Sequence, residues 1–353
     1  MDKLISLLFV LFLMMPVWES ENQTQNKKEA TAYDVTVSIN EWRVPWDGRP
    51  RDPYVAPNGT IYFVGQRTHY VGHFNPDTEE FSRFDLEDGA GPHTVVVDDS
   101  GTPWYTGNLA NHIGKVNPET GEVTKYMMPE DMSARDPHTI AFNNDGNMWF
   151  TSQGANSVGF FDVNTGEPEI IPVPTDRARP YGIVMANDGE QPWFTLFGTN
   201  KLGTVDPETM ELTEVELPRE EIRPRRLAIT SDGRVWYGDY ATGYVGVYNP
   251  ADDSHQEWAM PEGREAWPYA VTVDDQDRFW LVASGTNPNK FVGFDTNTEE
   301  FIVSEAIESG GGTVRHMVFH EPTNSIWFGT DTNYLGRATI NEQLFFEVKN
   351  SES

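Results

Sequence analysis

An aromatic residue recurs along this chain at an almost constant interval, and this repeat restricts the fold more than any other feature. Successive copies are 42, 45, 44, 43, 44 and 47 residues apart. A period near 44 residues is typical of β-propellers, in which each repeat forms one four-stranded blade. The seven copies are Tyr62, Trp104, Trp149, Trp193, Trp236, Trp280 and Trp327.

Turn signals divide each repeat into short strands. A Gly-containing turn such as Asn58-Gly59 or Asp145-Gly146 precedes the aromatic residue, and a glycine such as Gly203 follows about ten residues later. Such turns between short apolar runs indicate β-hairpins. We therefore predict an all-β, seven-bladed β-propeller with four-stranded blades around a central channel. Because repeats need their neighbours to bury apolar surface, residues 37–348 should form one domain.

Outside this domain the sequence predicts short segments only. Residues 1–20 resemble a signal peptide, because the apolar run 4–15 is too short to span a bilayer. We expect a disordered leader over 21–36, a tail over 349–353 and a periplasmic or secreted protein. The segment 39–45 resembles a fourth blade strand without a blade before it, so it should close the ring on the last blade. Residues 340–348 could compete for that place.

Charge narrows the choice of partners. The chain has 55 acidic and 25 basic residues, a formal net charge of −30, and no cysteine, so it forms no disulfide. This acidic excess disfavours binding to nucleic acid and to anionic membranes. We expect a monomer that acts on a small-molecule or sugar substrate. Several arginines fall at the starts of predicted innermost strands and favour an anionic group on that substrate; these are Arg179, Arg223, Arg225, Arg226 and Arg315.

The innermost strands have a shared opening. Six begin with a residue, a proline and then a polar or aromatic residue, as in Gly91-Pro92-His93, and we place the first of them at Asp52-Pro53-Tyr54. Proline is tolerated at the first residue of such a strand. One side chain per blade should therefore meet at the axis. The candidates for substrate binding are Tyr54, Tyr181, Arg179, Arg223, Arg225, Tyr269, Arg315 and His316, beside His93 and His138.

The repeat resembles that of a known family. The unit from Arg179 to Thr209, Pro-Tyr-Gly-Ile, Asp-Gly, Trp-Phe-Thr, Asn-Lys-Leu-Gly, Asp-Pro, is similar to the repeat of the streptogramin B lyase (virginiamycin B lyase) family of seven-bladed propellers. The likeness covers all seven blades. It implies a lyase that opens a cyclic depsipeptide at its ester by elimination.

The resemblance also implies a site. The family has Pro-His in two consecutive blades, an acidic residue before the second, and a Glu after the Trp-Phe of that blade, around Mg²⁺. His93 and His138 match the pair, Asp136 stands at the acidic position, and Gln153 replaces the Glu. This implies His138 or His93 as the base, and Asp136 with Gln153 as ligands of Mg²⁺, with Ca²⁺ as an alternative.

Three classes of function stay open. The first is the extracytoplasmic lyase, acting on an ester or on a uronate-containing sugar. The second is a calcium-dependent lactonase or hydrolase, for which we would expect more axial carboxylates than Asp52 and Asp136. The third is a non-catalytic ligand-binding propeller, which the replacement of Glu by Gln153 favours.

Overall fold

The computed structural model describes residues 33–344. Val35–Glu342 form one compact unit, which contains nearly all residues of the strands. The predicted signal peptide and tail lie outside the described residues, and so does the segment on which the prediction of secretion rests. None of the described helices has the length and apolar character of a membrane span.

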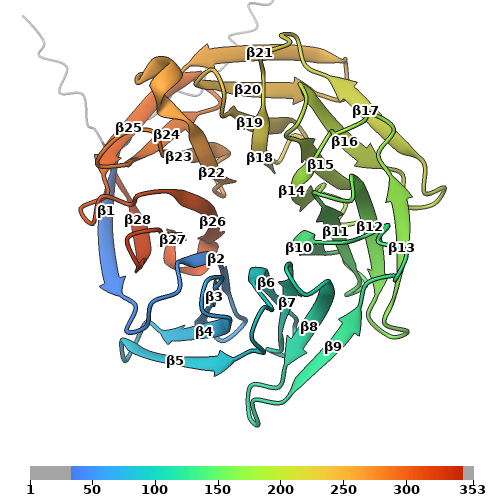
Figure 1. Cartoon of the computed structure of the whole chain (residues 1–353). Helices are drawn as coiled ribbons and strands as arrows, with labels where there is room; N and C mark the ends of the chain where they lie inside the picture. Colours follow the sequence, from blue (N-terminus) through green and yellow to red (C-terminus); the bar gives the residue numbers. More distant parts are fainter. Residues whose placement is uncertain (1–32, 345–353) are drawn as a thin grey trace, which may run out of the picture. The chain divides into compact units, whose positions relative to one another are not determined.

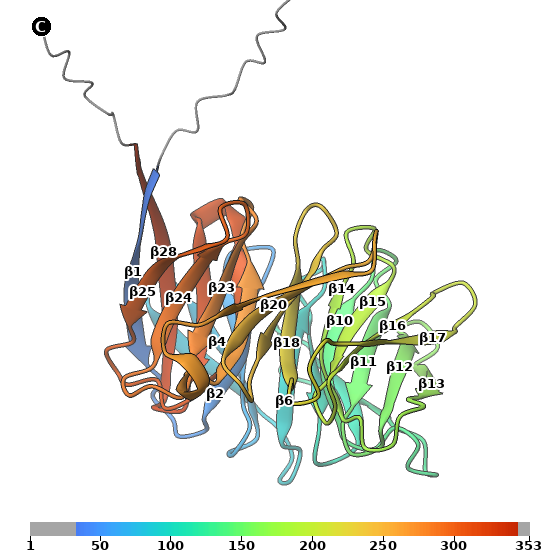
Figure 2. The same ribbon diagram turned by 90° about the horizontal axis from the view of Figure 1, so that it is seen from above.

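Seven four-stranded antiparallel sheets are arranged in a ring (Figure 1), which confirms the predicted β-propeller. Figure 2 shows the blades from the side, standing next to one another. In the first six blades the first strand in sequence lies nearest the axis and the next strands follow outward, whereas in the last blade β26 is innermost and the N-terminal strand β1 is outermost. The innermost strands are β2 (Pro50–Val55), β6 (Pro92–Val97), β10 (Pro137–Phe142), β14 (Pro180–Met185), β18 (Pro224–Ile229), β22 (Pro268–Val273) and β26 (Val314–His320).

The remaining strands complete the blades in chain order. The second strands are β3 (Ile61–Gly65), β7 (Pro103–Gly107), β11 (Met148–Ser152), β15 (Pro192–Leu196), β19 (Val235–Asp239), β23 (Arg278–Ala283) and β27 (Ser325–Thr330). The third strands are β4 (Tyr70–Asn75), β8 (His112–Val116), β12 (Ser157–Asp162), β16 (Lys201–Val205), β20 (Tyr244–Asn249), β24 (Lys290–Asp295) and β28 (Tyr334–Leu344). The outer strands are β5 (Glu80–Asp85), β9 (Val123–Met127), β13 (Glu167–Pro172), β17 (Leu212–Glu216), β21 (Ser254–Ala259), β25 (Glu300–Ala306) and β1 (Tyr33–Arg43); two short 3₁₀ helices are η1 (Gly263–Ala266) and η2 (Glu321–Thr323).

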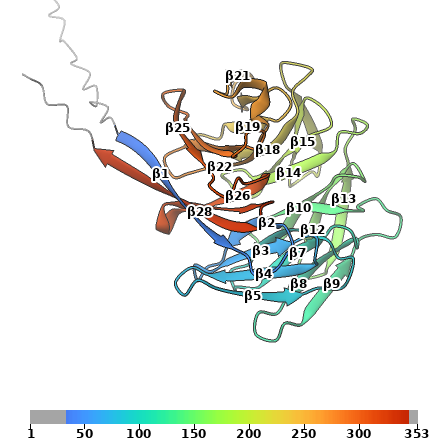
Figure 3. The same ribbon diagram turned by 60° about the vertical axis from the view of Figure 1, so that its left-hand side comes forward.

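The chain ends close the ring. Strand β1 pairs with β28, so the last blade has the order β1-β28-β27-β26. Figure 3 shows β1 alongside β28, although the two strands come from opposite ends of the sequence. The predicted closure by the N-terminal segment is therefore confirmed. The competing segment from residue 340 instead continues β28 as far as Leu344, and β1 already begins at Tyr33, inside the stretch expected to be a leader.

The repeat has a physical cause in cross-strand pairs. The third strand of each blade carries a glycine, and an aromatic ring of the second strand covers it. Phe194 is paired with Gly203, and a Cβ on Gly203 would overlap the Phe194 ring. The same pairing joins Phe63 to Gly72, Tyr105 to Gly114, Phe150 to Gly159, Tyr237 to Gly246, Trp280 to Gly293 and Phe328 to Gly336.

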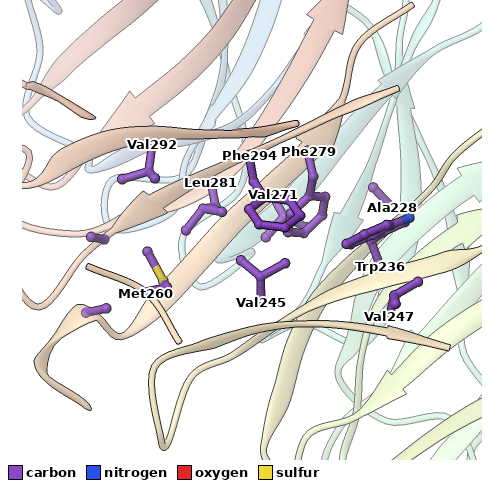
Figure 4. Close-up of a cluster of buried hydrophobic side chains, with 12 residues drawn as sticks. Ala228, Trp236, Val245, Val247, Met260, Val271, Phe279, Leu281, Val292 and Phe294 are labelled. Carbon is purple, nitrogen blue, oxygen red and sulfur yellow. The ribbon is translucent and has the colours of Figure 1, made fainter. Parts of the chain in front are cut away.

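The hydrophobic core lies between neighbouring blades. In Figure 4, Trp236 and Val245 of the fifth blade face Phe279, Leu281 and Phe294 of the sixth, and all five side chains are buried. Each blade thus covers the apolar face of the next, which is how a repeat of this kind obtains its stability. The inner strands are held rigidly as a result, and their first residues have fixed positions around the axis.

Candidate active site on the propeller axis

The residue after the start of each innermost strand occupies an equivalent position. Each of these strands begins opposite the last residues of the second strand, as Pro92 does opposite Gly107. The same register holds in the other blades. We call the seven residues that follow the strand starts the axial ring: Arg51, His93, His138, Tyr181, Arg225, Tyr269 and Arg315.

The first blade corrects one sequence-based assignment. Pro50, and not Pro53, is the strand start, because Pro50 pairs with Gly65 as Pro92 pairs with Gly107. Arg51 therefore takes the place in the ring that the sequence pattern predicted for Tyr54. Tyr54 lies farther along β2, half-buried and paired with Tyr62.

The predicted histidine pair is present. The ring centroids of His93 and His138 are 3.5 Å apart, and each side chain is only 3% exposed. The Arg51 guanidinium lies 2.7 Å from His93 Nε2. Because a guanidinium can only donate, Nε2 accepts this hydrogen bond and the proton of His93 is on Nδ1.

A closed cycle of hydrogen bonds then fixes His93. Nδ1 lies 3.1 Å from Thr94 Oγ1, and Thr94 Oγ1 lies 2.9 Å from Asp52 Oδ2. Arg51 Nε donates to Asp52 Oδ1 at 3.1 Å and completes the cycle. Both nitrogens of His93 are therefore engaged by protein groups.

One of the two ring nitrogens of His138 is hydrogen-bonded within the protein. Its Nδ1 lies 3.0 Å from Thr139 Oγ1, whereas within residues 33–344 no protein group bonds its Nε2. Burial, His93 and the guanidinium groups of Arg226 and Arg51 hold the pKa of His138 well below its usual value. Burial and the guanidinium groups also lower the pKa of His93. The two imidazoles are neutral at pH 7, and His138 is the one that can accept a proton.

Arg225 is enclosed by aromatic rings. Its guanidinium carbon lies 3.8 Å from the centroid of Tyr269, 4.4 Å from Tyr240, 4.6 Å from Phe197 and 5.2 Å from Tyr181. Such contacts between a cation and ring faces hold the group in place without neutralising it. Arg225 Nε has no hydrogen-bond partner among the described residues.

The two axial tyrosines contact each other. Their hydroxyl groups are hydrogen-bonded, and the His138 and Tyr181 rings lie 4.1 Å apart between centroids. Although burial alone would raise the pKa of Tyr181, the guanidinium groups of Arg225, Arg51 and Arg226 lower it. Burial and the neighbouring Tyr181 raise the pKa of Tyr269. An acidified phenol therefore stands beside the neutral His138.

The other predicted arginines are not equivalent. Arg315 is paired with Asp331, with Nη2 2.7 Å from Oδ2. Arg223 turns back to donate to the carbonyl oxygens of Glu220 and Ile222. Arg179 is exposed ahead of β14. Arg226 and His316 each lie one residue past the ring, deeper in the channel.

The sequence and the fold of this chain both match known proteins. Residues 17–287 match the sequence model of a family described as the "Virginiamycin B lyase family". The chain belongs to this family. Among solved structures it resembles the selenomethionine-substituted virginiamycin B lyase from Staphylococcus aureus, with a TM-score of 0.77 and 21% identity over 86% of this chain and 99% of the other.

Two further structures have the same fold as this member of the virginiamycin B lyase family. A streptogramin B lyase matches with a TM-score of 0.77 and 21% identity over 86% of this chain and 98% of the other. A catalytically inactive histidine-to-alanine variant of the Staphylococcus aureus enzyme, solved with quinupristin, matches with a TM-score of 0.78 and 21% identity over 86% and 99%. No curated protein shows a significant match.

One magnesium ligand expected from the virginiamycin B lyase family, Asp136, is hydrogen-bonded to the backbone here. Both carboxylate oxygens of Asp136 accept from the backbone N–H of Gly154, at 3.0 and 2.8 Å, and Oδ1 also accepts from that of Ala155 at 3.3 Å. Burial raises the pKa of Asp136 to about 6. Gln153 lies half-buried in the turn after β11.

The axial ring itself offers few groups that would hold a divalent ion. Within residues 33–344 no three His, Asp or Glu side chains are grouped as metal ligands would be. Mg²⁺ prefers several oxygen ligands, and the axial ring instead offers guanidinium groups, which repel a cation. Mg²⁺ or Ca²⁺ at Asp136 and Gln153 stays a prediction.

Sequence reasoning missed an outer set of residues. In four blades the residue directly after the second strand contacts the axial ring: Gln66 accepts from Arg51 at 2.9 Å, Phe197 and Tyr240 pack on Arg225, and Asp331 pairs with Arg315. Gln153 holds the same place in its own blade. The shared position after the second strand could have identified these residues, because the family pattern has its Glu at that position.

Proposed function

We propose that this protein is a carbon–oxygen lyase that opens an ester in a small cyclic substrate by β-elimination at the axial ring. The observation that carries the proposal is the neutral His138, with a free Nε2, and the caged cation of Arg225, which lie on either side of Tyr181. Membership of the virginiamycin B lyase family supports the reaction class, and this pair supplies the two chemical functions that the reaction needs.

His138 would act as the base. In the tautomer that this step requires, Nδ1–H donates to Thr139 Oγ1 and the Nε2 lone pair accepts the proton on the carbon next to the substrate carbonyl. The electrons of that C–H bond form a carbon–carbon double bond, and the ester C–O bond breaks with its electrons leaving on the carboxylate. A positioned general base contributes about 10² to 10⁴ in rate.

The arginines and tyrosines would stabilise the charge that develops. An enolate and a departing carboxylate are both anions, and Arg225 lies next to Tyr181 and Tyr269. One of these two hydroxyl groups donates to the other, which leaves one O–H to donate to the substrate. Fixed donors and cations in a water-poor site favour such a transition state strongly. In this proposal the guanidinium and phenol groups stabilise the negative charge of the transition state.

The face that carries the axial ring suits an apolar substrate. Trp267, 43% exposed, precedes β22 and lies 6.2 Å from Tyr240 between ring centroids. Leu109, 66% exposed, follows β7 on the same face. Large exposed apolar side chains around polar groups are typical of binding sites.

Quinupristin is the first compound to test, because a relative was solved with it. Incubation with the protein, followed by mass spectrometry and ultraviolet spectroscopy, should give a ring-opened product of unchanged mass with a new conjugated double bond. A mass gain of one water would make the protein a hydrolase. Intact quinupristin at high protein concentration would contradict the proposed substrate.

Chelation tests whether stabilisation of the developing negative charge requires a metal ion. Because the axial ring offers no set of oxygen ligands, we expect dialysis against EDTA to leave the rate of ring opening unchanged. Loss of activity on chelation, with recovery on adding Mg²⁺ but not on adding NaCl, would contradict this and restore the metal-assisted mechanism.

A further inference from the structure

A cavity occupies the axis beyond the axial ring. Its volume is about 290 Å³, near the lower end for small-molecule sites. It is lined by residues from all seven innermost strands, from Thr94 and Thr139 near the strand starts to Phe142 and Met185 at the strand ends. It therefore opens on the face opposite the axial ring and is distinct from the proposed active site.

The polar groups of this cavity are gathered at its inner end. We call them the deep ring: Arg226, His316, Thr94 and Thr139, each one residue beyond an axial ring position. The walls nearer the mouth are apolar and half-buried, including Tyr54, Phe142, Val184, Met185 and Val318. An apolar pocket with a few convergent polar groups is the usual form of a ligand site.

The deep ring has an excess of positive charge. Arg226 Nη2 donates to Asp52 Oδ2 at 2.8 Å, and Arg51 shares the same fully buried carboxylate. Two buried guanidinium groups thus face one carboxylate. Leaving a buried charge without a partner is costly, so one further anion would stabilise the cluster.

Two side chains of the deep ring also have hydrogen-bonding groups without a partner among the described residues. Arg226 donates from Nε to the Arg315 carbonyl oxygen at 3.1 Å and from Nη1 to Thr139 Oγ1 at 3.4 Å. Each terminal nitrogen of Arg226 carries a second N–H for which no acceptor is present among the described residues. His316 Nδ1 is buried and likewise has no partner within residues 33–344.

The lining also contrasts with the rest of the molecule. The chain carries 55 acidic residues, yet among residues 33–344 no Asp or Glu lines this cavity and Arg226 is its charged residue. We propose that the cavity binds a small organic carboxylate with an apolar body, whose carboxylate is held by Arg226 and whose body packs on Phe142 and Met185.

Phenylacetate is a suitable probe, since it joins a carboxylate to one ring. With the methionine methyl groups labelled with ¹³C, titration should shift the signals of Met185 and Met317, which line the cavity. The exposed Met127 and Met132 serve as internal controls. Phenylacetamide, of the same shape but neutral, should bind about tenfold more weakly, because hydrogen bonds to charged groups are stronger.

Three variants make the test specific. Met185→Trp should fill the cavity and abolish phenylacetate binding, while His138→Ala on the opposite side should leave it unchanged. Arg226→Gln should remove the preference for the acid over the amide. The proposal is overturned if the two probes bind equally, if the shifts occur at Met127 or Met132 instead, or if Met185→Trp binds as the unchanged protein does.

Discussion

At the scale of residues, the axis combines neutral histidines with cations. Although burial alone would raise the pKa of Asp52, the guanidinium groups of Arg51 and Arg226 hold it well below its usual value. One ionised carboxylate thus balances only part of the positive charge around His93 and His138. Their protonation is disfavoured by the surroundings, which keeps an unprotonated nitrogen available on His138 at pH 7.

Acid should therefore destabilise the fold through these histidines. Burial and Arg226 lower the pKa of His316 from 6.5 to about 3. Below pH 6.5 the unfolded chain binds a proton at His316 that the folded chain does not. The stability from this group is present above 6.5 and is lost as the pH falls toward 3, by about 1.4 kcal/mol per pH unit.

The matched comparison is His316→Gln, which cannot titrate. Between pH 6.5 and 4 its free energy of unfolding, measured with urea, should fall less steeply than that of the unchanged protein. Parallel curves would show that His316 is not held neutral in the folded state.

At the scale of elements, each blade depends on an aromatic ring lying over a glycine. Gly203→Ala forces a methyl group against the Phe194 ring, and overpacking of this kind costs about 1 to 3 kcal/mol. The melting temperature should fall. Thr213→Ala, an exposed change in the adjacent strand β17, is the control and should have little effect. Equal melting temperatures for the two variants would contradict the pairing.

Strand β1 closes the ring by packing on the last blade, and this closure also belongs to the scale of elements. Val35, Val37 and Ile39 pack on the core of the last blade, and Trp42 stacks on Trp327 at 5.6 Å between centroids. A chain beginning at Val44 loses these contacts and exposes β28 as an edge. Compared with a chain beginning at Tyr33, it should lose several kcal/mol and melt a few degrees lower. Identical melting curves would mean that β1 does not close the ring.

At the scale of the whole molecule, the period of the repeat was enough to predict the propeller, since a 44-residue unit with four short strands has few other solutions. The prediction for the first blade was wrong because this blade has two prolines. Pro50 precedes Tyr62 by twelve residues, the spacing of Pro92 to Trp104, whereas Pro53 precedes it by nine. Counting back from the aromatic residue would have identified Arg51.

Side-chain direction was harder to predict than position. Asp136 holds the expected place in the sequence, and its carboxylate accepts hydrogen bonds from the turn at Gly154 and Ala155, which the sequence pattern did not indicate. The cage around Arg225 depends on Phe197 and Tyr240, which come from two blades. The cavity beyond the deep ring depends on how seven strands pack together, which no single repeat reveals.

The central claim is that His138 is the base and His93 a positioning residue, and its most direct test is the rate of quinupristin opening in two variants. His138→Ala should lower kcat by about 10² to 10⁴, with KM nearly unchanged. His93→Gln, whose amide can accept from Arg51 and donate to Thr94, should stay within about tenfold of the unchanged protein, since positioning is kept. A fully active His138→Ala, or an inactive His93→Gln beside it, would contradict the account.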